Sequence, residues 1–345
     1  MKILIASDSY KECLPAREVA TAMAAGVLET YPSAEIACLP LADGGEGTLE
    51  VLSEALHAKV QTVEVHDPLG RKIEAKFGVS GDIGIIEVAQ ACGFSRLSPP
   101  ERNPIVATSM GVGELIMTAH KAGCLQLFVS LGGSATCDGG AGMLSVSGIK
   151  GVFREMSIEL LCDVENPFTG PEGAARVFAP QKGASASDVE SLEVRMRSLA
   201  EQYLAETGID VSATPGAGAA GGIAGALIAY GGAKVVSGID RVLELVGFDE
   251  AARDADLIIT GEGRSDLQTL KGKVPMGVLR HCPATRVALV SGAIAPDAAP
   301  ALSEAGFWKA VPATPPGMKL SQAMNPDTAK RNIMNAAVNC ANLIG

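Results

Sequence analysis

The 345-residue sequence has no long hydrophobic run, no excess of positive charge and few histidines. No apolar segment approaches the roughly 20 residues that a membrane-spanning helix needs, so we expect no membrane partner. Asp and Glu number 39 against 28 Lys and Arg, which gives a formal net charge of −11. Binding to nucleic acid depends on clustered positive charge, so this balance argues against a nucleic-acid partner. A small anionic ligand remains compatible, because a local group of cations and N–H groups can outweigh the net charge.

The eight cysteines include no C-x-x-C pair and no zinc-binding spacing. The N-terminus enters a strand pattern at once and shows no signal peptide, so we expect reduced thiols and a cytoplasmic protein. The phosphate-binding string G-x-x-x-x-G-K-[ST] is absent, as are the catalytic strings H-E-x-x-H and G-x-S-x-G. The four histidines lie outside every glycine-rich segment. Carboxylates and lysines are therefore expected to carry any chemistry.

Short apolar runs alternate with amphipathic stretches, which predicts an α/β fold with parallel sheets covered by helices. The predicted strands are residues 3–6, 35–39, 83–88, 127–131, 257–260, 287–291 and 309–311. The predicted helices are residues 16–29, 47–56, 113–121, 188–205, 222–230, 275–280, 296–304 and 327–343. For the helix near residue 188, Ser187 and Glu190 fit a capping box.

Two regions interrupt this alternation and indicate two α/β domains. Residues 65–110 are typical of hairpins, with turn signals at 67–70 and 80–82, and residues 150–220 are rich in Pro and Gly. We therefore expect an inserted α/β domain at residues 65–244. Residues 1–64 and 245–345 would form a discontinuous Rossmann-like domain with a parallel sheet.

Three glycine-dense segments follow predicted strands: Asp43–Gly47, Gly132–Gly142 and Thr260–Asp266. Glycine lets backbone N–H groups approach a ligand closely, and a helix start presents unpaired N–H groups. Within the second segment, the backbone of Gly132, Gly133, Ser134, Ala135 and Thr136 suits a phosphate cradle. Together the segments favour a site for a phosphorylated substrate, although close packing of strand on helix would also need small residues.

Charged residues in and near these segments are candidates for metal and anion binding, each with an alternative structural role. Asp43 and Glu46 could hold Mg²⁺ or sit favourably at a helix N-terminus. Asp163 could be a catalytic carboxylate or part of an Asx turn. The cations could bind phosphate or lie on the surface. The carboxylates are Asp43, Glu46, Asp138, Asp163 and Asp266, and the cations are Lys11, Lys182, Arg264 and Lys273.

The segment Pro215–Gly222 contains a literal G-x-G-x-x-G, with Asp240 about twenty residues further on. No strand precedes it, so an NAD site is disfavoured. We expect a glycine-rich helix entry that faces a ligand or another stretch of backbone.

The chain closely resembles the type-1 glycerate kinase family from Met1 to Gly345. The matching motifs, in order, are Asp8–Lys11, Ala42–Thr48, Gly111–Ile116, Gly132–Thr136, Asp138–Met143, Cys162–Val164, Pro180–Ala184, Pro215–Gly222, Thr260–Arg264 and Gly272–Pro275. The resemblance implies two α/β domains with the active site in the cleft between them. It also implies phosphorylation of D-glycerate with ATP and Mg²⁺, and 2-phosphoglycerate is the favoured product over 3-phosphoglycerate.

The sequence departs from the family pattern at several places. Ser7 stands where the family usually has Pro, Cys137 where it has Asn, and Ser265 and Leu267 where it has Ile and Ser. The segment 148–161 is shorter than in the family and lacks a glycine-rich stretch.

We therefore expect the Gly132–Thr136 backbone, with Lys11, to cradle phosphates, and Lys182 and Lys273 to assist nucleotide binding. Mg²⁺ would be held by carboxylates of Asp43, Glu46 and Asp138. Arg264 would grip the glycerate carboxylate, and Asp163 or Asp266 would orient or deprotonate the attacking hydroxyl.

The alternatives are a kinase for a related small hydroxy acid, a ligand-binding homologue without turnover, and an NAD-dependent dehydrogenase. The sequence is also compatible with a homodimer.

Overall fold

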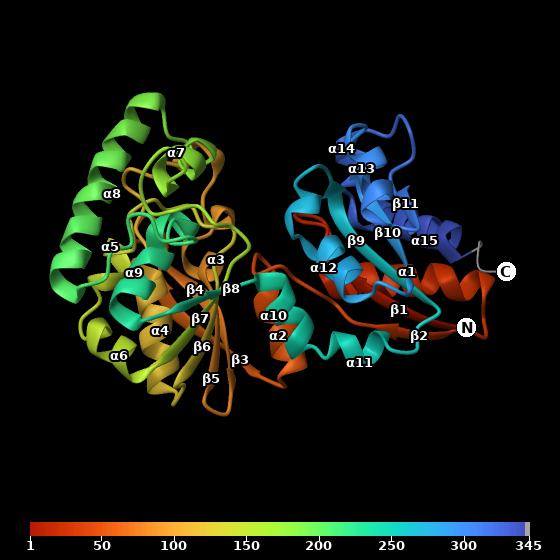
Figure 1. Ribbon diagram of the computed structural model, residues 1–345, viewed down its shortest axis with the longest axis horizontal. Coiled ribbons are helices and arrows are strands. Elements are labelled where there is room, and N and C mark those ends of the chain that lie inside the picture. The colour runs from red at the N-terminus through yellow and green to blue at the C-terminus, as the bar shows by residue number, and fades with distance from the viewer. Residues whose placement is uncertain (342–345) are drawn as a thin grey trace. The chain divides into compact units, whose positions relative to one another are not determined.

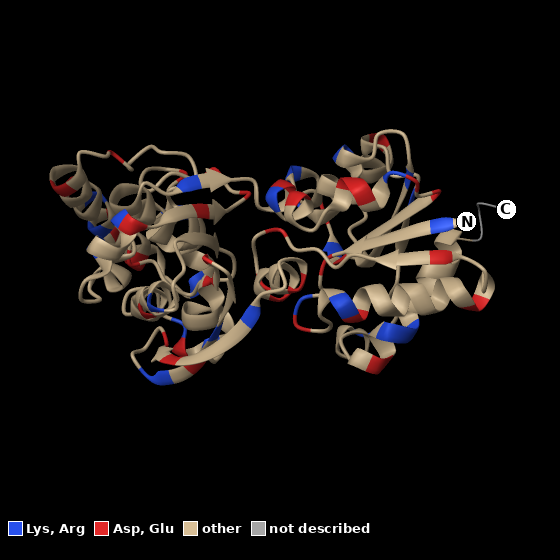
Figure 2. Ribbon diagram, turned by 90° about the horizontal axis from the view of Figure 1, so that it is seen from below, with Lys and Arg blue, Asp and Glu red and all other residues tan. Residues whose placement is uncertain are grey.

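The computed structural model describes residues 1–341, which divide into two compact units. Unit 1 combines Met1–Asp43 with the chain from Ile239 onward, and unit 2 is Gly44–Gly238. Each unit has its own sheet and its own hydrophobic core. Within the described residues, no helix is long and apolar enough to cross a membrane. Figure 2 shows Lys and Arg distributed among Asp and Glu along both units.

Unit 1 is built on a five-stranded sheet in the order β11-β10-β9-β1-β2, with every neighbouring pair parallel. The strands are β1 (Lys2–Ser7), β2 (Glu35–Cys38), β9 (Leu257–Ser265), β10 (Arg286–Ile294) and β11 (Lys309–Pro312). The central strands are apolar and buried, as strands covered on both faces must be.

Two long helices of unit 1, α1 (Ala16–Thr30) and α15 (Pro326–Ala341), lie side by side (Figure 1) and bury their apolar stripes against β1, β9 and β10. Helix α12 (Val274–His281) packs against β9 and β1. The remaining helices of four or more residues here are α10 (Gly238–Leu245), α11 (Phe248–Ala252), α13 (Ala298–Ala305) and α14 (Leu320–Ala323).

Unit 2 carries a six-stranded sheet in the order β3-β4-β5-β6-β7-β8. The first three strands are antiparallel neighbours, and β5 to β8 run parallel. The strands are β3 (Lys59–His66), β4 (Lys72–Ser80), β5 (Ile83–Glu87), β6 (Gln126–Ser130), β7 (Ser157–Leu161) and β8 (Lys234–Val236).

Both faces of this sheet are covered. Because neighbouring strand residues point to opposite faces, Ile86 joins the main core, whereas Ile85 lies beside Gly78, which faces Ser53 of α2. Helix α4 packs on β3, β4 and β5, and α9 packs on β7. The helices are α2 (Thr48–Ala55), α3 (Val88–Cys92), α4 (Met110–Lys121), α5 (Ala141–Leu144), α6 (Ile149–Glu155), α7 (Ala174–Phe178), α8 (Ala186–Thr207) and α9 (Ile223–Gly231).

The predicted α/β class is confirmed, and each predicted strand and helix has a counterpart in the structure. Residues 342–343 of the last predicted helix lie outside the described residues. The turns expected at 67–70 and 80–82 join β3 to β4 and β4 to β5. Strands β3, β4, β7 and β8 were not among the predicted strand ranges, and the last two are short.

Two further expectations differ from the structure. Unit 2 begins at Gly44 where the sequence placed its inserted domain at residues 65–244, because α2 packs on β4 and β5 and β3 pairs with β4. The capping box of α8 is formed by Ser185 and Asp188, two residues before the predicted pair, so the helix begins at Ala186.

Candidate functional site

In unit 2, two of the glycine-rich segments meet beyond the carboxyl ends of parallel strands, where open α/β sheets bind ligands. The Gly44 carbonyl oxygen accepts hydrogen bonds from the backbone N–H groups of Leu131 (3.1 Å) and Gly132 (3.2 Å). Strand β6 ends at Ser130, directly before these donors. The segments Gly44–Gly47 and Gly132–Thr136 therefore form one paired loop, which we call the glycine cradle.

Backbone meets backbone in the glycine cradle. A Cβ atom on Gly44, whose φ is +84°, would lie 2.6 Å from the carbonyl oxygen of Leu161. A Cβ atom on Gly132 would lie 2.5 Å from the Cα atom of Gly45. A side chain on Gly132 would separate the two loops, and one on Gly44 would meet the end of β7, so both positions favour glycine.

Glu87, at the end of β5, is a buried carboxylate that sequence reasoning missed. Its Oε2 atom accepts hydrogen bonds from the backbone N–H groups of Gly47 and Leu49, each at 3.1 Å. Burial raises the pKa of the Glu87 carboxyl, and the two N–H donors act in the opposite direction. Glu87 thus fixes the first turn of α2 and, through it, the Gly44–Gly47 loop. It is the last residue of an apolar strand, which is the one signal that could have found it.

Lys182 lies beneath the glycine cradle and is 3% exposed. Its Nζ atom donates to the Ser134 hydroxyl oxygen (2.9 Å) and to the Thr136 carbonyl oxygen (2.7 Å). Burial lowers the pKa of the ammonium, and nearby Cys137, Cys92 and Asp138 raise it. The Lys182 side chain binds the loop itself. The role in nucleotide binding that the sequence predicts for it would therefore act through the loop.

Asp138 is buried and surrounded by hydrogen-bond donors. Its Oδ2 atom accepts from the N–H and hydroxyl groups of Ser109, both at 2.8 Å, and from the Gly142 N–H at 3.0 Å. Its Oδ1 atom accepts from the Gly140 N–H at 3.0 Å. Four donors occupy both oxygens, so the carboxylate holds the starts of α4 and α5 together, and the arrangement does not favour its predicted role as a magnesium ligand.

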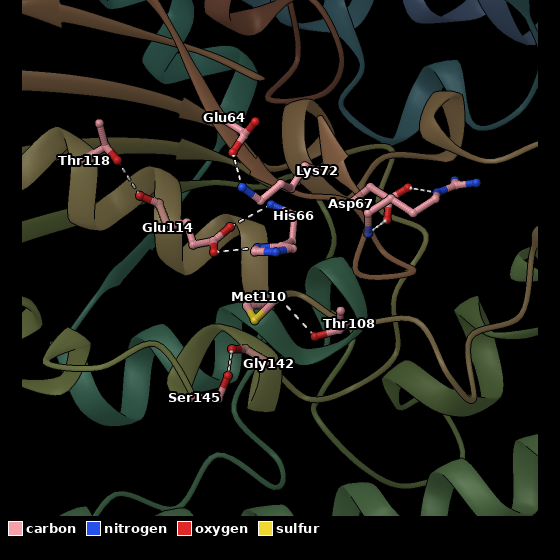
Figure 3. A network of polar contacts seen from close by, with 11 residues as sticks. Glu64, His66, Asp67, Lys72, Thr108, Met110, Glu114, Thr118, Gly142 and Ser145 are labelled. Carbon is pink, nitrogen blue, oxygen red and sulfur yellow. Dashed lines mark hydrogen bonds and ion pairs between the residues drawn. The ribbon is translucent and has the colours of Figure 1, made fainter. Parts of the chain in front are cut away.

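The surroundings of α4 contain a second polar network (Figure 3). The Nδ1 atom and the backbone N–H of His66 each lie 2.7 Å from an oxygen of Glu114. Asp67 accepts from Arg71 Nε at 2.6 Å in the adjacent β3–β4 turn. Met110 N–H donates to the Thr108 hydroxyl oxygen at 3.2 Å. These contacts fix the hairpin against α4 and so support the helix start that Asp138 holds.

Asp163, two residues beyond β7, has its Oδ1 atom 2.8 Å from the Gly238 N–H and 3.1 Å from the Ser237 hydroxyl oxygen, which both donate. The side chain is half-buried. The same carboxylate therefore connects the end of β7 to the last residues of unit 2.

The G-x-G-x-x-G segment packs against another stretch of backbone, which is one of the two alternatives that the sequence predicts. The Gly139 N–H donates to the Gly221 carbonyl oxygen at 3.0 Å. A Cβ atom on Gly221, whose φ is +65°, would lie 2.0 Å from the Thr136 carbonyl oxygen. The segment Pro215–Gly222 therefore packs on the backbone at Thr136, the last residue of the glycine cradle.

In unit 1, the ends of β1 and β9 bring carboxylates together. Asp8 follows β1 and is 5% exposed, and its Oδ1 atom accepts from the Ser9 N–H at 2.7 Å. Burial, followed by the charge of Asp43, raises the pKa of Asp8 to about 8, while Lys11 acts in the opposite direction. Glu262 adds a further, smaller increase. Asp8 is a second buried carboxylate that the sequence reasoning left out of the site.

Glu262 is also buried, and two hydroxyl groups donate to its Oε1 atom: Ser265 at 2.8 Å and Thr269 at 2.6 Å. Burial raises the pKa of this carboxyl, and the two hydrogen bonds and Lys273 lower it. Ser265 stands where the resembling family usually has Ile, so the departure supplies one of these two donors.

The other predicted residues of unit 1 lie at its surface. Arg264 and Lys11 are exposed. Asp266 lies 3.9 Å from the Lys273 Nζ atom and accepts from the Gln268 N–H at 2.8 Å. A half-exposed pair at that distance contributes little stability, which leaves both side chains available for a ligand.

Among residues 1–341, no three His, Cys, Asp or Glu side chains form a group that could hold a metal ion. Mg²⁺ commonly takes one or two carboxylates and completes its shell with water and substrate phosphates. Asp43 and Glu46 are each at least partly exposed, whereas both carboxylate oxygens of Asp138 already accept hydrogen bonds.

Comparison with known proteins identifies the family. The model of the glycerate kinase family matches residues 3–152 and 144–345. The chain belongs to the glycerate kinase family. A Bacillus subtilis glycerate kinase is 40% identical over 329 residues, covering 86% of each chain. An Escherichia coli glycerate 2-kinase is 41% identical over 308 residues, covering 81% of each.

A solved structure from Salmonella typhimurium LT2, described as a candidate glycerate kinase 2, has a TM-score of 0.83 and 38% identity to this family member. The likeness covers 100% of this chain and 98% of the other. The two ranges matched by the glycerate kinase model overlap at residues 144–152. The alignment with a Bacillus cereus glycerate kinase runs over 379 positions, more than the 345 residues here. That relative therefore has residues without a counterpart in this chain.

Proposed function

We propose that this protein transfers the γ-phosphoryl group of ATP to a hydroxyl of D-glycerate with the help of Mg²⁺, giving 2-phosphoglycerate. The observation that carries the proposal is a paired glycine loop beyond parallel strands in a chain that is about 40% identical to glycerate kinases over most of its length. The name of the E. coli relative, a glycerate 2-kinase, favours the 2-phosphate product.

Phosphoryl transfer needs in-line positioning and neutralisation of charge more than covalent help. In unit 2, the backbone N–H groups of Gly133, Ser134 and Thr136 would bind phosphate oxygens. Those of Gly132 and Ala135 already donate to the carbonyl oxygens of Gly44 and Cys92. Glu87 and Lys182 would hold the glycine cradle in shape. When bound, Mg²⁺ would supply positive charge that offsets the negative charge of the phosphates. Asp43 and Glu46 would supply its carboxylates.

In unit 1, the exposed guanidinium of Arg264 would bind the glycerate carboxylate in bidentate fashion. Lys11 and Lys273 would add positive charge for phosphate. The attacking hydroxyl would be oriented, and its proton accepted, by Asp163 or Asp266; both already accept backbone N–H bonds that fix their direction. We also propose a cytoplasmic location, where eight free thiols would stay reduced.

The test is release of ADP from ATP by the folded protein with D-glycerate, with and without Mg²⁺, and assignment of the product by ³¹P NMR. Mg²⁺-dependent ADP release and a phosphate on the 2-hydroxyl are expected. Absence of turnover above background would reject the kinase, and a phosphate on the 3-hydroxyl would reject the position.

Asp266→Asn separates a catalytic carboxylate from a surface one. We expect turnover to fall by about 10²-fold or more, the usual range for a lost general base, while the melting temperature stays within a few degrees. Asp254→Asn, at another exposed aspartate of unit 1, is the control and should leave both quantities unchanged. Full activity in Asp266→Asn would assign the role to Asp163, to be tested by Asp163→Asn.

A kinase for a related small hydroxy acid is the second candidate, favoured by the residues of the Bacillus cereus relative that have no counterpart in this chain. Screening small 2- and 3-hydroxy acids in the same assay separates it from the first. A higher kcat/KM for another acid than for D-glycerate would establish it.

A further inference from the structure

We propose that Lys182 is a positioning residue that orients the Ser134 hydroxyl as a hydrogen-bond donor to the nucleotide phosphates. The inference rests on the proposed function for the identity of the ligand. It differs from a direct contact between this lysine and phosphate, because the ammonium lies under the loop and acts through Ser134.

The direction of the hydrogen bonds carries the argument. An ammonium can only donate, so the Ser134 oxygen must accept the 2.9 Å bond from Lys182. The hydroxyl hydrogen of Ser134 is then left to point elsewhere. Within residues 1–341, no acceptor for that hydrogen is found. Ser134 is 5% exposed, so this unused donor belongs to a largely buried residue of the glycine cradle.

The second bond of Lys182 fixes the far end of the same loop. The Lys182 Nζ atom also donates to the Thr136 carbonyl oxygen at 2.7 Å. This bond directs that oxygen toward the ammonium, so it would not face an incoming anion. Gly221 packs against the same carbonyl group from another segment. With the Thr136 carbonyl held, the peptide groups between Gly132 and Thr136 are kept from rotating. Their carbonyl oxygens are therefore kept from turning toward phosphate.

Burial makes this arrangement consequential. Both Lys182 and Ser134 are more than nine-tenths buried, and hydrogen bonds from a charged donor are stronger than neutral ones in such surroundings. A donor polarised by an ammonium and aimed at a phosphate is preorganised before the ligand arrives. The expected signature is a change in affinity for the phosphate chain with little change for glycerate.

The experiment measures binding of Mg–ATP and of inorganic tripolyphosphate by calorimetry, together with KM and kcat, for wild type, Lys182→Met, Ser134→Ala and the double variant. Each single variant is expected to weaken binding of both probes by about 10- to 100-fold, the range for a lost charge-assisted bond. KM for D-glycerate should change less than about twofold. Because Lys182 acts through Ser134, the double variant should bind no worse than Lys182→Met.

Lys121→Met is the matched control, since it removes an exposed lysine from the same unit, and it should bind as wild type does. Ser134→Ala keeps the test decisive if Lys182→Met does not fold. Wild-type affinity in Ser134→Ala, or additive losses in the double variant, would overturn the inference, as would a wild-type protein that binds neither probe. Lys182-dependent binding without glycerate turnover would support the inference while rejecting the proposed function.

Discussion

Asp8 shows at the scale of one residue how the site differs from an ordinary surface. It is a buried carboxyl group whose neighbours include Asp43, Glu262 and Lys11, and its pKa is raised to about 8 from 3.8. Between these two values, the folded chain keeps a proton that the unfolded chain has released. The contribution of Asp8 to the free energy of unfolding therefore falls as the pH rises from about 4 to 8.

Asp8→Asn cannot ionise, so we expect it to be more stable than wild type near pH 8, with the advantage vanishing near pH 4. Urea denaturation at several pH values, with EDTA present, measures this difference. Asp254→Asn serves as the exposed control. Parallel pH profiles for Asp8→Asn and wild type would show that Asp8 is ionised in the folded chain at neutral pH.

The sequence marks single residues that follow strands, and it does not reveal hydrogen-bond partners that are remote in the chain. Gly132 and Asp163 stand directly beyond apolar runs, and the sequence placed both in the site. Lys182 bonds to Thr136, 46 residues away, and nothing in the sequence marks that pairing. Asp138 was chosen as a metal ligand because it is acidic and near glycine; its four donors come mainly from backbone, which leaves no trace in residue types.

At the scale of elements, glycine positions decide how closely loops and helices approach. Helix starts and strand cores follow from apolar periodicity and were predicted to within a few residues. The packing of Pro215–Gly222 on the Thr136–Gly139 backbone was predicted only as one of two alternatives, because a ligand and a neighbouring backbone impose the same demand for small residues.

Gly221→Ala tests this packing against a matched position. Gly221 and Gly70 both have positive φ, +65° and +77°, but a Cβ atom on Gly221 would meet the Thr136 carbonyl oxygen, whereas one on Gly70 meets open space. We expect Gly70→Ala to cost about 1 kcal/mol from backbone strain. Gly221→Ala should cost about 1–3 kcal/mol more from overpacking, measured by urea denaturation. Equal losses would show that backbone strain alone explains both.

At the scale of the whole molecule, unit 2 has the organisation of an inserted domain. Its first residue, Gly44, packs against Leu161, and its last, Gly238, bonds to Asp163. Both ends therefore lie at the end of β7. All residues of its main core come from within the unit. The sequence predicts an inserted domain at residues 65–244, whereas this compact unit runs from Gly44 to Gly238. The chain shows no change of composition at residue 44.

We expect a fragment of residues 44–238 to fold alone. Circular dichroism during urea denaturation should show a single cooperative transition, because the fragment retains its sheet, its core and adjacent termini. The same fragment truncated after residue 230 loses β8 and is the control expected to unfold more easily. A non-cooperative transition in the full fragment would show that unit 2 depends on unit 1.

The contact between Gly44 and Leu131 has a consequence for how this protein can vary. Where a ligand loop is made of main chain, the sequence records it as missing side chains, so an alanine scan of polar residues would pass over much of it. The informative substitution there is the addition of one methyl group.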